Sequence, residues 1–332
     1  MNGPFHRNCI VLLLTAIFCV FCLGMAVASV ATFSEMATGA RAALNEVRRS
    51  VDSGMPMAAE QGLTDISRIV RETRNLLAAT RDADPEQRNA ALAVARSAMA
   101  AARSAAEQAA RSENPELAGK AIETSEAARG ILVLLLEMAR ESGDADLLAG
   151  ILETFVDFSA ALNVAAARAR DSRDGELAEQ ANAAMGGLMG DIETGALLAE
   201  GFGRPEALLF SLSALDGVSE GLFHLTETAR LIGNADMAQR AADDASRIAR
   251  ILDGIEARSF EAEATGEDPV RVAAQAGIRT RIVEIRARIE TVLTAAAAAG
   301  AARPEVARGR GVRPGDILDR LPIRDTVPAS PK

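Results

Sequence analysis

The residue types that most often carry out chemistry are scarce in this chain of 332 residues, which has two histidines, three cysteines and neither tryptophan nor tyrosine. Glu220, His224 and Glu227 have i, i+4 and i+7 spacing, so on a helix they would share one face and could ligate a metal ion. A di-metal site in a helical bundle needs ligands from several helices, including a second histidine. The other histidine, His6, lies near the N-terminus. We therefore expect His224 to be a surface or hydrogen-bonded residue.

The body of the chain also lacks the residues that other catalytic arrangements require. All three cysteines lie between Cys9 and Cys22, so the body contains no Cys–His pair and no clustered zinc ligands. The glycine-rich run 186–190 follows no predicted strand and precedes no Gly-Lys-Ser/Thr, which argues against a phosphate loop. Gly186 and Gly190 instead predict a close helix contact or a kink. We expect no cofactor and no enzymatic activity.

Composition favours helices and limits the possible partners. The chain is 49% hydrophobic, contains 69 alanines and has a net charge of -10. Alanine has the highest helix propensity, and the apolar fraction is ample for a core. An acidic body with few aromatic rings is poorly suited to binding nucleic acid, which attracts cations and stacking side chains. We therefore predict an all-α protein with no nucleic-acid partner.

The N-terminal segment is apolar enough to cross a membrane. Residues 9–31 form an uninterrupted apolar run of 23 residues, which as a helix is about 34 Å long. The small residues at 26–28, with Arg7 before the run, also fit a secretory signal peptide, although a signal core is usually shorter. Residues 1–31 are therefore predicted to be a transmembrane anchor, with a signal peptide as the alternative. Arg41, Arg48 and Arg49 after the run favour a single-pass protein with a cytoplasmic body.

Turn signals recur about every 30 residues through the body, residues 32–300. They are Ser53–Pro56, Asp82–Pro85, Ser112–Pro115, Ser142–Asp144, Ser172–Gly175, Gly201–Pro205 and Gly233–Asn234. In two of them Asp84 and Asn114 have the pattern of N-caps followed by proline at the first helical position. Apolar residues between the turns follow three-and-four spacing. The pattern predicts eight or nine antiparallel helices of about 26 residues, arranged as two four-helix bundles or as one elongated array.

Charge is distributed unevenly. The body has 28 basic and 42 acidic residues, a net charge of -14, whereas the tail, residues 301–332, has a net charge of +3. The sign of the body argues against its uniform attraction to anionic lipid. Asp243 and Asp244 are adjacent, and we expect both in solvent. A solvated helix face is the simpler interpretation of the arginines of the last helix, and contact with lipid or a partner is the alternative. The candidate contact residues in the last helix and the tail are Arg279, Arg281, Arg286, Arg288, Arg308, Arg310 and Arg313.

The tail is rich in proline and glycine and has no helical period, so it is predicted to be mostly disordered. Four apolar residues lie among its charges: Ile317, Leu318, Leu321 and Ile323. They form a candidate docking segment for a groove on a protein partner, or they pack on the chain's own body.

The layout of an anchor at Cys9–Ala31 followed by a helical body resembles the MamY family of magnetosome membrane proteins. This resemblance implies liposome tubulation and a BAR-like role in membrane shaping. We expect a membrane-anchored scaffold that shapes or organises a membrane or aligns partner proteins, with lipid and further copies of the chain as partners. The alternative is an extracytoplasmic helical-bundle sensor or ligand-binding module, similar to chemoreceptor sensor bundles.

Overall fold

The computed structural model describes residues 32–80, 82–263 and 269–300, which form nine helices and no strand. The predicted anchor and the tail, with the candidate residues at positions 308–323, lie outside the described residues. After a helix at 32–52 come α2 (Pro56–Ala79), α3 (Pro85–Ser112), α4 (Pro115–Ser142), α5 (Ala145–Ser172), α6 (Gly175–Gly201), α7 (Pro205–Ile232), α8 (Ala235–Glu263) and α9 (Pro269–Ala298). The prediction of an all-helical body is confirmed.

The helix boundaries follow from capping chemistry. The Asp84 carboxylate accepts a hydrogen bond from the Gln87 amide, and the Gln87 side chain accepts one from the Asp84 amide, forming a capping box. Asn114 caps α4, and proline occupies the first position of both α3 and α4, as predicted. Several helices end in a residue with a left-handed backbone, such as Gly143 (φ 66°), which stops the helix and turns the chain back.

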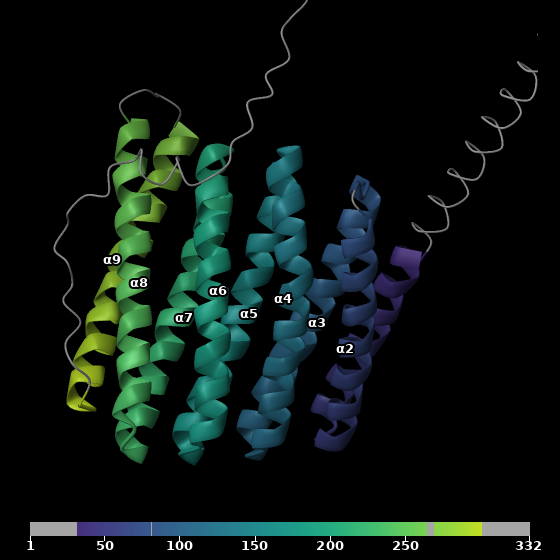
Figure 1. The fold of residues 1–332 in the computed structure, drawn as a ribbon, viewed down its shortest axis with the longest axis horizontal. Helices are drawn as coiled ribbons and strands as arrows, with labels where there is room; N and C mark the ends of the chain where they lie inside the picture. Colours follow the sequence, from purple (N-terminus) through teal and green to yellow (C-terminus); the bar gives the residue numbers. More distant parts are fainter. Residues whose placement is uncertain (1–31, 81, 264–268, 301–332) are drawn as a thin grey trace, which may run out of the picture.

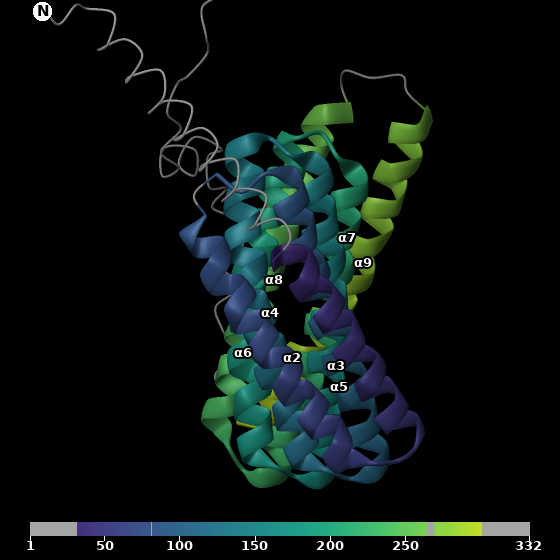
Figure 2. The same cartoon turned by 90° about the vertical axis from the view of Figure 1, so that its right-hand side faces the viewer.

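The helices form two layers in one array. The even-numbered helices α2, α4, α6 and α8 begin at intervals of 59, 60 and 60 residues, so the repeating unit is a hairpin of two helices. Among α2–α9, each helix contacts only those one or two positions away in the chain, with odd helices in one layer and even helices in the other. Figure 1 shows the hairpins side by side along the long axis, and Figure 2, viewed from one end of the array, shows the even and odd helices on opposite sides. The structure therefore favours a single array over two separate bundles.

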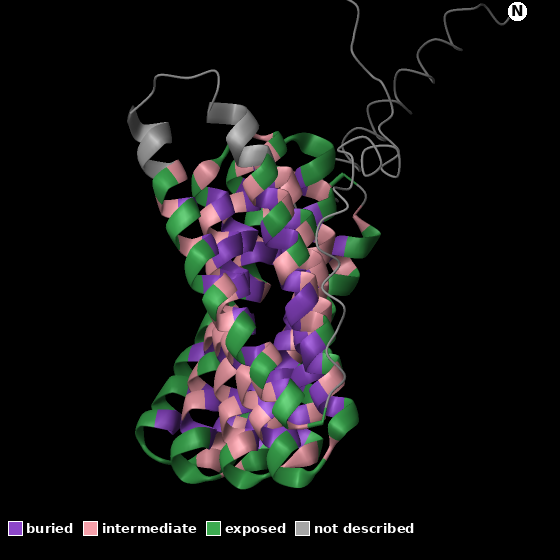
Figure 3. Ribbon diagram, turned by 90° about the vertical axis from the view of Figure 1, so that its left-hand side faces the viewer, coloured by how far each residue is buried: buried purple, intermediate pink, exposed green. Residues whose placement is uncertain are grey.

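The core runs continuously between the layers. Buried residues line the inside of the array, and exposed residues concentrate at the turns and on the outer faces (Figure 3). Phe33, Phe155 and Phe158 are completely buried. The two end helices, 32–52 and α9, expose mostly polar residues such as Arg41 and Glu284. These polar outer faces cap the apolar core, as the ends of helical repeats require.

Glycines set the closest contact in the odd layer, between α5 and α7. A Cβ atom on Gly217 of α7 would lie 2.6 Å from Ser159 Oγ of α5, which is shorter than van der Waals contact. One on Gly221 of α7 would lie 2.1 Å from Met185 Cε of α6. Gly217 therefore permits the close crossing of α5 and α7, and Gly221 leaves room beside it for Met185.

One helix within the described ranges, α5, is long and apolar enough to cross a membrane by length and composition alone, and 61% of its apolar window is buried. It contacts α3, α4, α6 and α7. This burial accounts for its apolar composition, because a core helix surrounded by neighbours has little need of a polar face.

Candidate functional site

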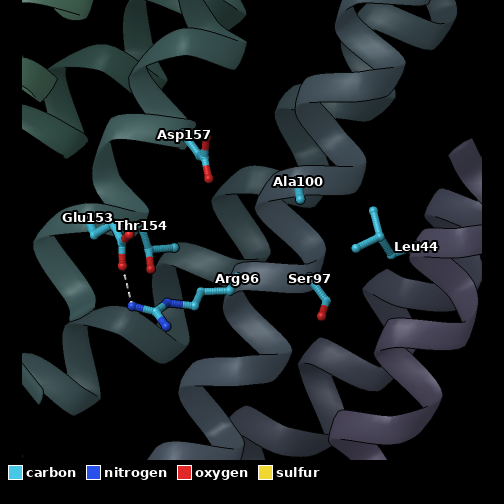
Figure 4. Close-up of a pocket in the computed structure, with 7 residues that line it drawn as sticks. All are labelled: Leu44, Arg96, Ser97, Ala100, Glu153, Thr154 and Asp157. Carbon is cyan, nitrogen blue, oxygen red and sulfur yellow. Dashed lines mark hydrogen bonds and ion pairs between the residues drawn. The ribbon is translucent and has the colours of Figure 1, made fainter.

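A pocket of about 300 Å³ opens on the odd layer, where helix 32–52 and α5 flank α3. Its lining residues are Leu44, Arg96, Ser97, Ala100, Glu153, Thr154 and Asp157. In Figure 4 the side chains of Leu44, Thr154 and Asp157 point into the same space, with the stem of Arg96 along one side. The pocket therefore combines an apolar wall with a polar wall, as small-molecule sites commonly do.

The polar wall of the pocket offers mainly hydrogen-bond acceptors. The Thr154 hydroxyl donates to the Gly150 carbonyl at 2.7 Å, which leaves its oxygen lone pairs available. Arg96 donates to Glu153, and Arg103, outside the pocket, donates from Nη1 to Asp157 Oδ1 at 2.9 Å. Each carboxylate therefore has a second oxygen with no protein hydrogen bond within the described part of the chain. A ligand with hydrogen-bond donors would complement this wall.

The candidate arginines on α9 mostly pair with acids of neighbouring helices. Arg286 donates to Asp253 and Glu256 of α8, at 2.7 and 2.6 Å. On the other side of α9, Arg281 lies 3.6 Å and Arg288 lies 3.2 Å from Asp216 of α7. These three guanidiniums have side-chain exposures of only 35–43%, so they hold α9 to the array. Arg279 is exposed.

Similar pairs connect α3 with α5, α4 with α6 and α6 with α8, which are helices two positions apart in the chain. The pairs are Arg96 with Glu153, Arg103 with Asp157, Arg129 with Asp191, Arg240 with Glu179 and Arg247 with Glu193. Their sequence separations of 54 to 62 residues match the hairpin repeat. Sequence reasoning missed these contacts, because many arginines and acids lie this far apart in the chain and spacing alone does not show which of them meet.

The most buried of these charges lie on α6, beside the glycines at 186–190. Arg129 of α4 donates to Asp191 Oδ2 at 2.6 Å and to Glu126 Oε2 at 2.7 Å. A Cβ atom on Gly187 would lie 2.7 Å from Arg129 Nη1, so this glycine lets the guanidinium lie across α6. Burial raises the pKa of both Asp191 and Glu126, outweighing the opposite effect of Arg129.

Asp244 of α8 lies on the same helix surface, and the prediction that it is in solvent was wrong. It is half-buried, with its Oδ2 atom 3.9 Å from the position of a Cβ on Gly186, and it accepts no hydrogen bond from the part of the chain that the structure describes. Burial raises its pKa to about 6. The adjacent Asp243 is exposed, as predicted, and accepts a hydrogen bond from Gln239. A helix turns by about 100° per residue, which separates the two carboxylates.

The glycines at 186–190, where a close helix contact or a kink was predicted, lie beside charged side chains instead. At Gly190 an added Cβ would lie 3.3 Å from Arg247 Nη2, so the neighbour there is an arginine side chain, as it is at Gly187. The α6 helix continues through the run without a break. The glycines of 186–190 therefore accommodate charged side chains from α4 and α8, whereas the close helix contact expected there occurs between α5 and α7.

His224 is a hydrogen-bonded residue, as expected. Its Nδ1 atom lies 2.9 Å from Arg170 Nη1, and the arginine can only donate, so Nδ1 is the acceptor. Burial and, secondarily, the charge of Arg170 lower the pKa of His224. Glu227 pairs with Arg230, and Glu220 pairs with Arg288. Among the described residues, no group of three or more His, Cys, Asp or Glu side chains is placed to hold a metal ion.

Comparison with known proteins found no matching protein family and no matching curated protein. Several solved structures are similar. The chain resembles the DHF58 filament (20% identity, 72% of this chain, 99% of that chain, TM-score 0.46) and the DHF119 filament (22%, 69%, 97%, 0.45). It also resembles the de novo designed helical repeat protein DHR64 (20%, 80%, 98%, 0.37). All are similar in helical-repeat architecture alone, so the function must be argued from this chain's own residues.

Proposed function

We propose that the protein is a membrane-anchored helical-repeat scaffold that aligns partner proteins along a membrane. The observation that carries this proposal is the burial of Phe33, only two residues after the apolar run ends at Ala31. Packing of the first helix into the array leaves almost no tether. A retained anchor would therefore hold the array directly at the bilayer and fix its orientation, as a scaffold requires.

Charge on the anchor side favours protein partners over direct lipid contact. Helix 32–52 begins at the upper edge in Figure 1, and the α2–α3, α4–α5 and α6–α7 turns lie on that edge. Acidic residues predominate in and beside these turns: Asp82, Asp84, Glu86, Glu141, Asp144, Asp146 and Glu206. Such an edge would be repelled by anionic lipid. The BAR-like version of the proposal, drawn from the MamY resemblance, would therefore need lipid contacts elsewhere, and the tail arginines Arg308, Arg310 and Arg313 are the candidates.

Mixing the protein with liposomes distinguishes partner alignment from membrane shaping. A chain lacking residues 1–31 would be mixed with anionic vesicles, and sedimentation and vesicle shape compared with those for a chain that also lacks residues 301–332. We expect neither chain to tubulate vesicles, and any binding to disappear with the tail. Tubulation by the chain without its tail would contradict partner alignment and support membrane shaping by the array itself.

The side of the membrane and self-association are tested separately. A reporter fused after Lys332 would fix the topology of the full chain, and we expect the cytoplasmic signal. Light scattering of the detergent-solubilised chain would measure the number of copies, and we propose that the scaffold associates with itself. A strictly monomeric chain would contradict that part of the proposal, and an extracytoplasmic reporter signal would favour the second candidate.

That second candidate is an extracytoplasmic ligand-binding module, and the pocket at Leu44 is the observation that favours it. Leu44 belongs to the helix that follows the predicted anchor, so a bound molecule would contact that helix directly. Thermal-shift measurements of the wild type with small polar amines would test binding. Leu44→Trp, which would fill the pocket, should abolish any shift. An undiminished shift in this variant would exclude the pocket as the binding site.

A further inference from the structure

The contact between α6 and α8, called here the α6–α8 seam, contains a half-buried carboxyl group, that of Asp244. Asp244 of α8 lies against Gly186 of α6, half-buried, and accepts no hydrogen bond from the described residues. Partial loss of hydration without a compensating donor destabilises a carboxylate ion. The position of Asp244 between the two helices therefore disfavours its charged form.

The nearby cations are already paired with other groups. Arg247, one turn along α8, donates to Glu193 of α6 at 2.9 Å. Arg240, one turn in the other direction, donates to Glu179 of α6. Each attracts Asp244 only through space, and the exposed Asp243 repels it. Asp244 is thus surrounded by charges without a direct partner of its own.

Further acids crowd the same surface from the α4 side. Arg129 is shared between Glu126 and Asp191, and Glu126 Oε1 is buried without a hydrogen bond. On the opposite side of α6, the closest groups from α5 and α7 are uncharged, with Leu152 facing Gly195 and Gly221 facing Met185. On the far side of α8, Arg286 of α9 pairs with Asp253 and Glu256. Among the described residues, none of these arginines donates a hydrogen bond to Asp244.

We propose that the α6–α8 seam is a proton-operated joint: α8 closes on the glycines of α6 when Asp244 is protonated and moves outward when Asp244 ionises. Ionisation favours outward movement because it allows water to hydrate the carboxylate. The α8–α9 hairpin contacts α6 through α8 alone, whereas both of its helices contact α7, with pairs such as Arg288–Asp216. The hairpin would therefore pivot on α7, and mild acid would tighten the end of the array.

Hydrogen exchange of the full-length chain in detergent tests this joint. Protection of the α8 amides, corrected for intrinsic exchange, would be compared near pH 5 and near pH 7.5. We expect α8 to exchange about tenfold faster at the higher pH, as the difference in protonation between closed and open states predicts. Asp244→Asn should keep α8 closed at both pH values, with protection matching that of the wild type in acid.

Asp243→Asn is the matched control, because it removes a neighbouring carboxylate that is exposed and hydrogen-bonded to Gln239. It should retain the pH dependence of the wild type. Equal protection of wild-type α8 at both pH values would overturn the proposal. So would an Asp244→Asn chain whose α8 still opens at the higher pH, since Glu126 or Asp191 would then carry the effect.

Discussion

At the scale of single residues, His224 is the group whose titration opposes that of Asp244. Its folded-state pKa is lowered, because burial and Arg170 both disfavour the imidazolium ion. As the pH falls below about 6.5, the unfolded chain binds this proton before the folded chain does. The contribution of His224 to stability is therefore full above the unfolded pKa and decreases as the pH falls toward the folded pKa.

Replacement of His224 by glutamine tests whether the contribution of His224 to stability decreases as the pH falls. Glutamine keeps an acceptor for Arg170 but carries no charge at any pH. The free energy of unfolding of His224→Gln, relative to the wild type, should rise as the pH is lowered from about 7.5 to about 5. Urea titrations at the two pH values measure the change. A relative stability that stays constant or falls in acid would contradict the account of His224.

The residue scale also shows where prediction from sequence reached its limit. The hydrogen-bonded environment of His224 followed from the shortage of ligand partners. The burial of Asp244 did not, because adjacent acids on a helix look equally polar until the rotation of that helix against its neighbour is known. The same rotation decides that Arg286 and Arg288 pair within the array. Each depends on side-chain contacts between helices that sequence spacing alone does not specify.

At the scale of helices, the α5–α7 crossing depends on glycine. Gly217→Ala should destabilise the protein by about 1–2 kcal/mol, because overpacking against Ser159 outweighs the helix propensity gained by alanine. Gly277→Ala in α9 is the matched control, since its Cβ would lie 3.8 Å from the nearest atom, Leu209 Cδ2. This control should stabilise by about 0.5–1 kcal/mol. Thermal unfolding compares the two, and equal effects would contradict a close crossing at Gly217.

The helix ends allow a second test. Glu113 (φ 56°) and Arg173 (φ 55°) follow α3 and α5 in the left-handed conformation that glycine adopts without strain. Glu113→Gly and Arg173→Gly should each raise the free energy of unfolding by about 0.5–1 kcal/mol. Gly143→Ala, at the equivalent turn with open space around its Cβ, should lower it by about 1 kcal/mol. Denaturant titration measures these changes, and destabilisation by both glycine variants would refute the backbone argument.

Helix boundaries were the most predictable part of this protein. Caps such as Asp84 and Asn114, with a following proline, are local signals that need no knowledge of the fold. The choice between two bundles and one array was not predictable, because the helices have similar lengths and the same type of apolar seam. The array depends on contacts between helices two apart, such as Gly217 with Ser159, and no local pattern indicates which helices lie in one layer.

At the scale of the whole molecule, contacts limited to nearby helices predict tolerance to shortening. A chain that ends at Gly233, and so lacks α8 and α9, should keep α2–α7 folded, because no contact of α2, α3, α4 or α5 is lost. Circular dichroism should show helicity reduced in proportion to the residues removed, with a cooperative thermal transition. Loss of all helical signal would mean that the array folds as one indivisible unit. Exposure of apolar residues on α6 and α7 is expected to lower solubility.

The number of described helices has a geometric consequence. Nine is odd, so the first and last helices run in the same direction. Gly300, just after α9, lies beside Ala235 on the edge opposite the start of helix 32–52. Helix 32–52 thus begins at one edge of the array, and α9 ends at the opposite edge. The two edges are about 45 Å apart, which is the length of α9. Adding or deleting whole hairpins would lengthen or shorten the array without changing the distance between these two edges. In the proposed membrane-anchored scaffold, the thickness of the protein layer above the bilayer would be set by helix length, and its breadth by repeat number.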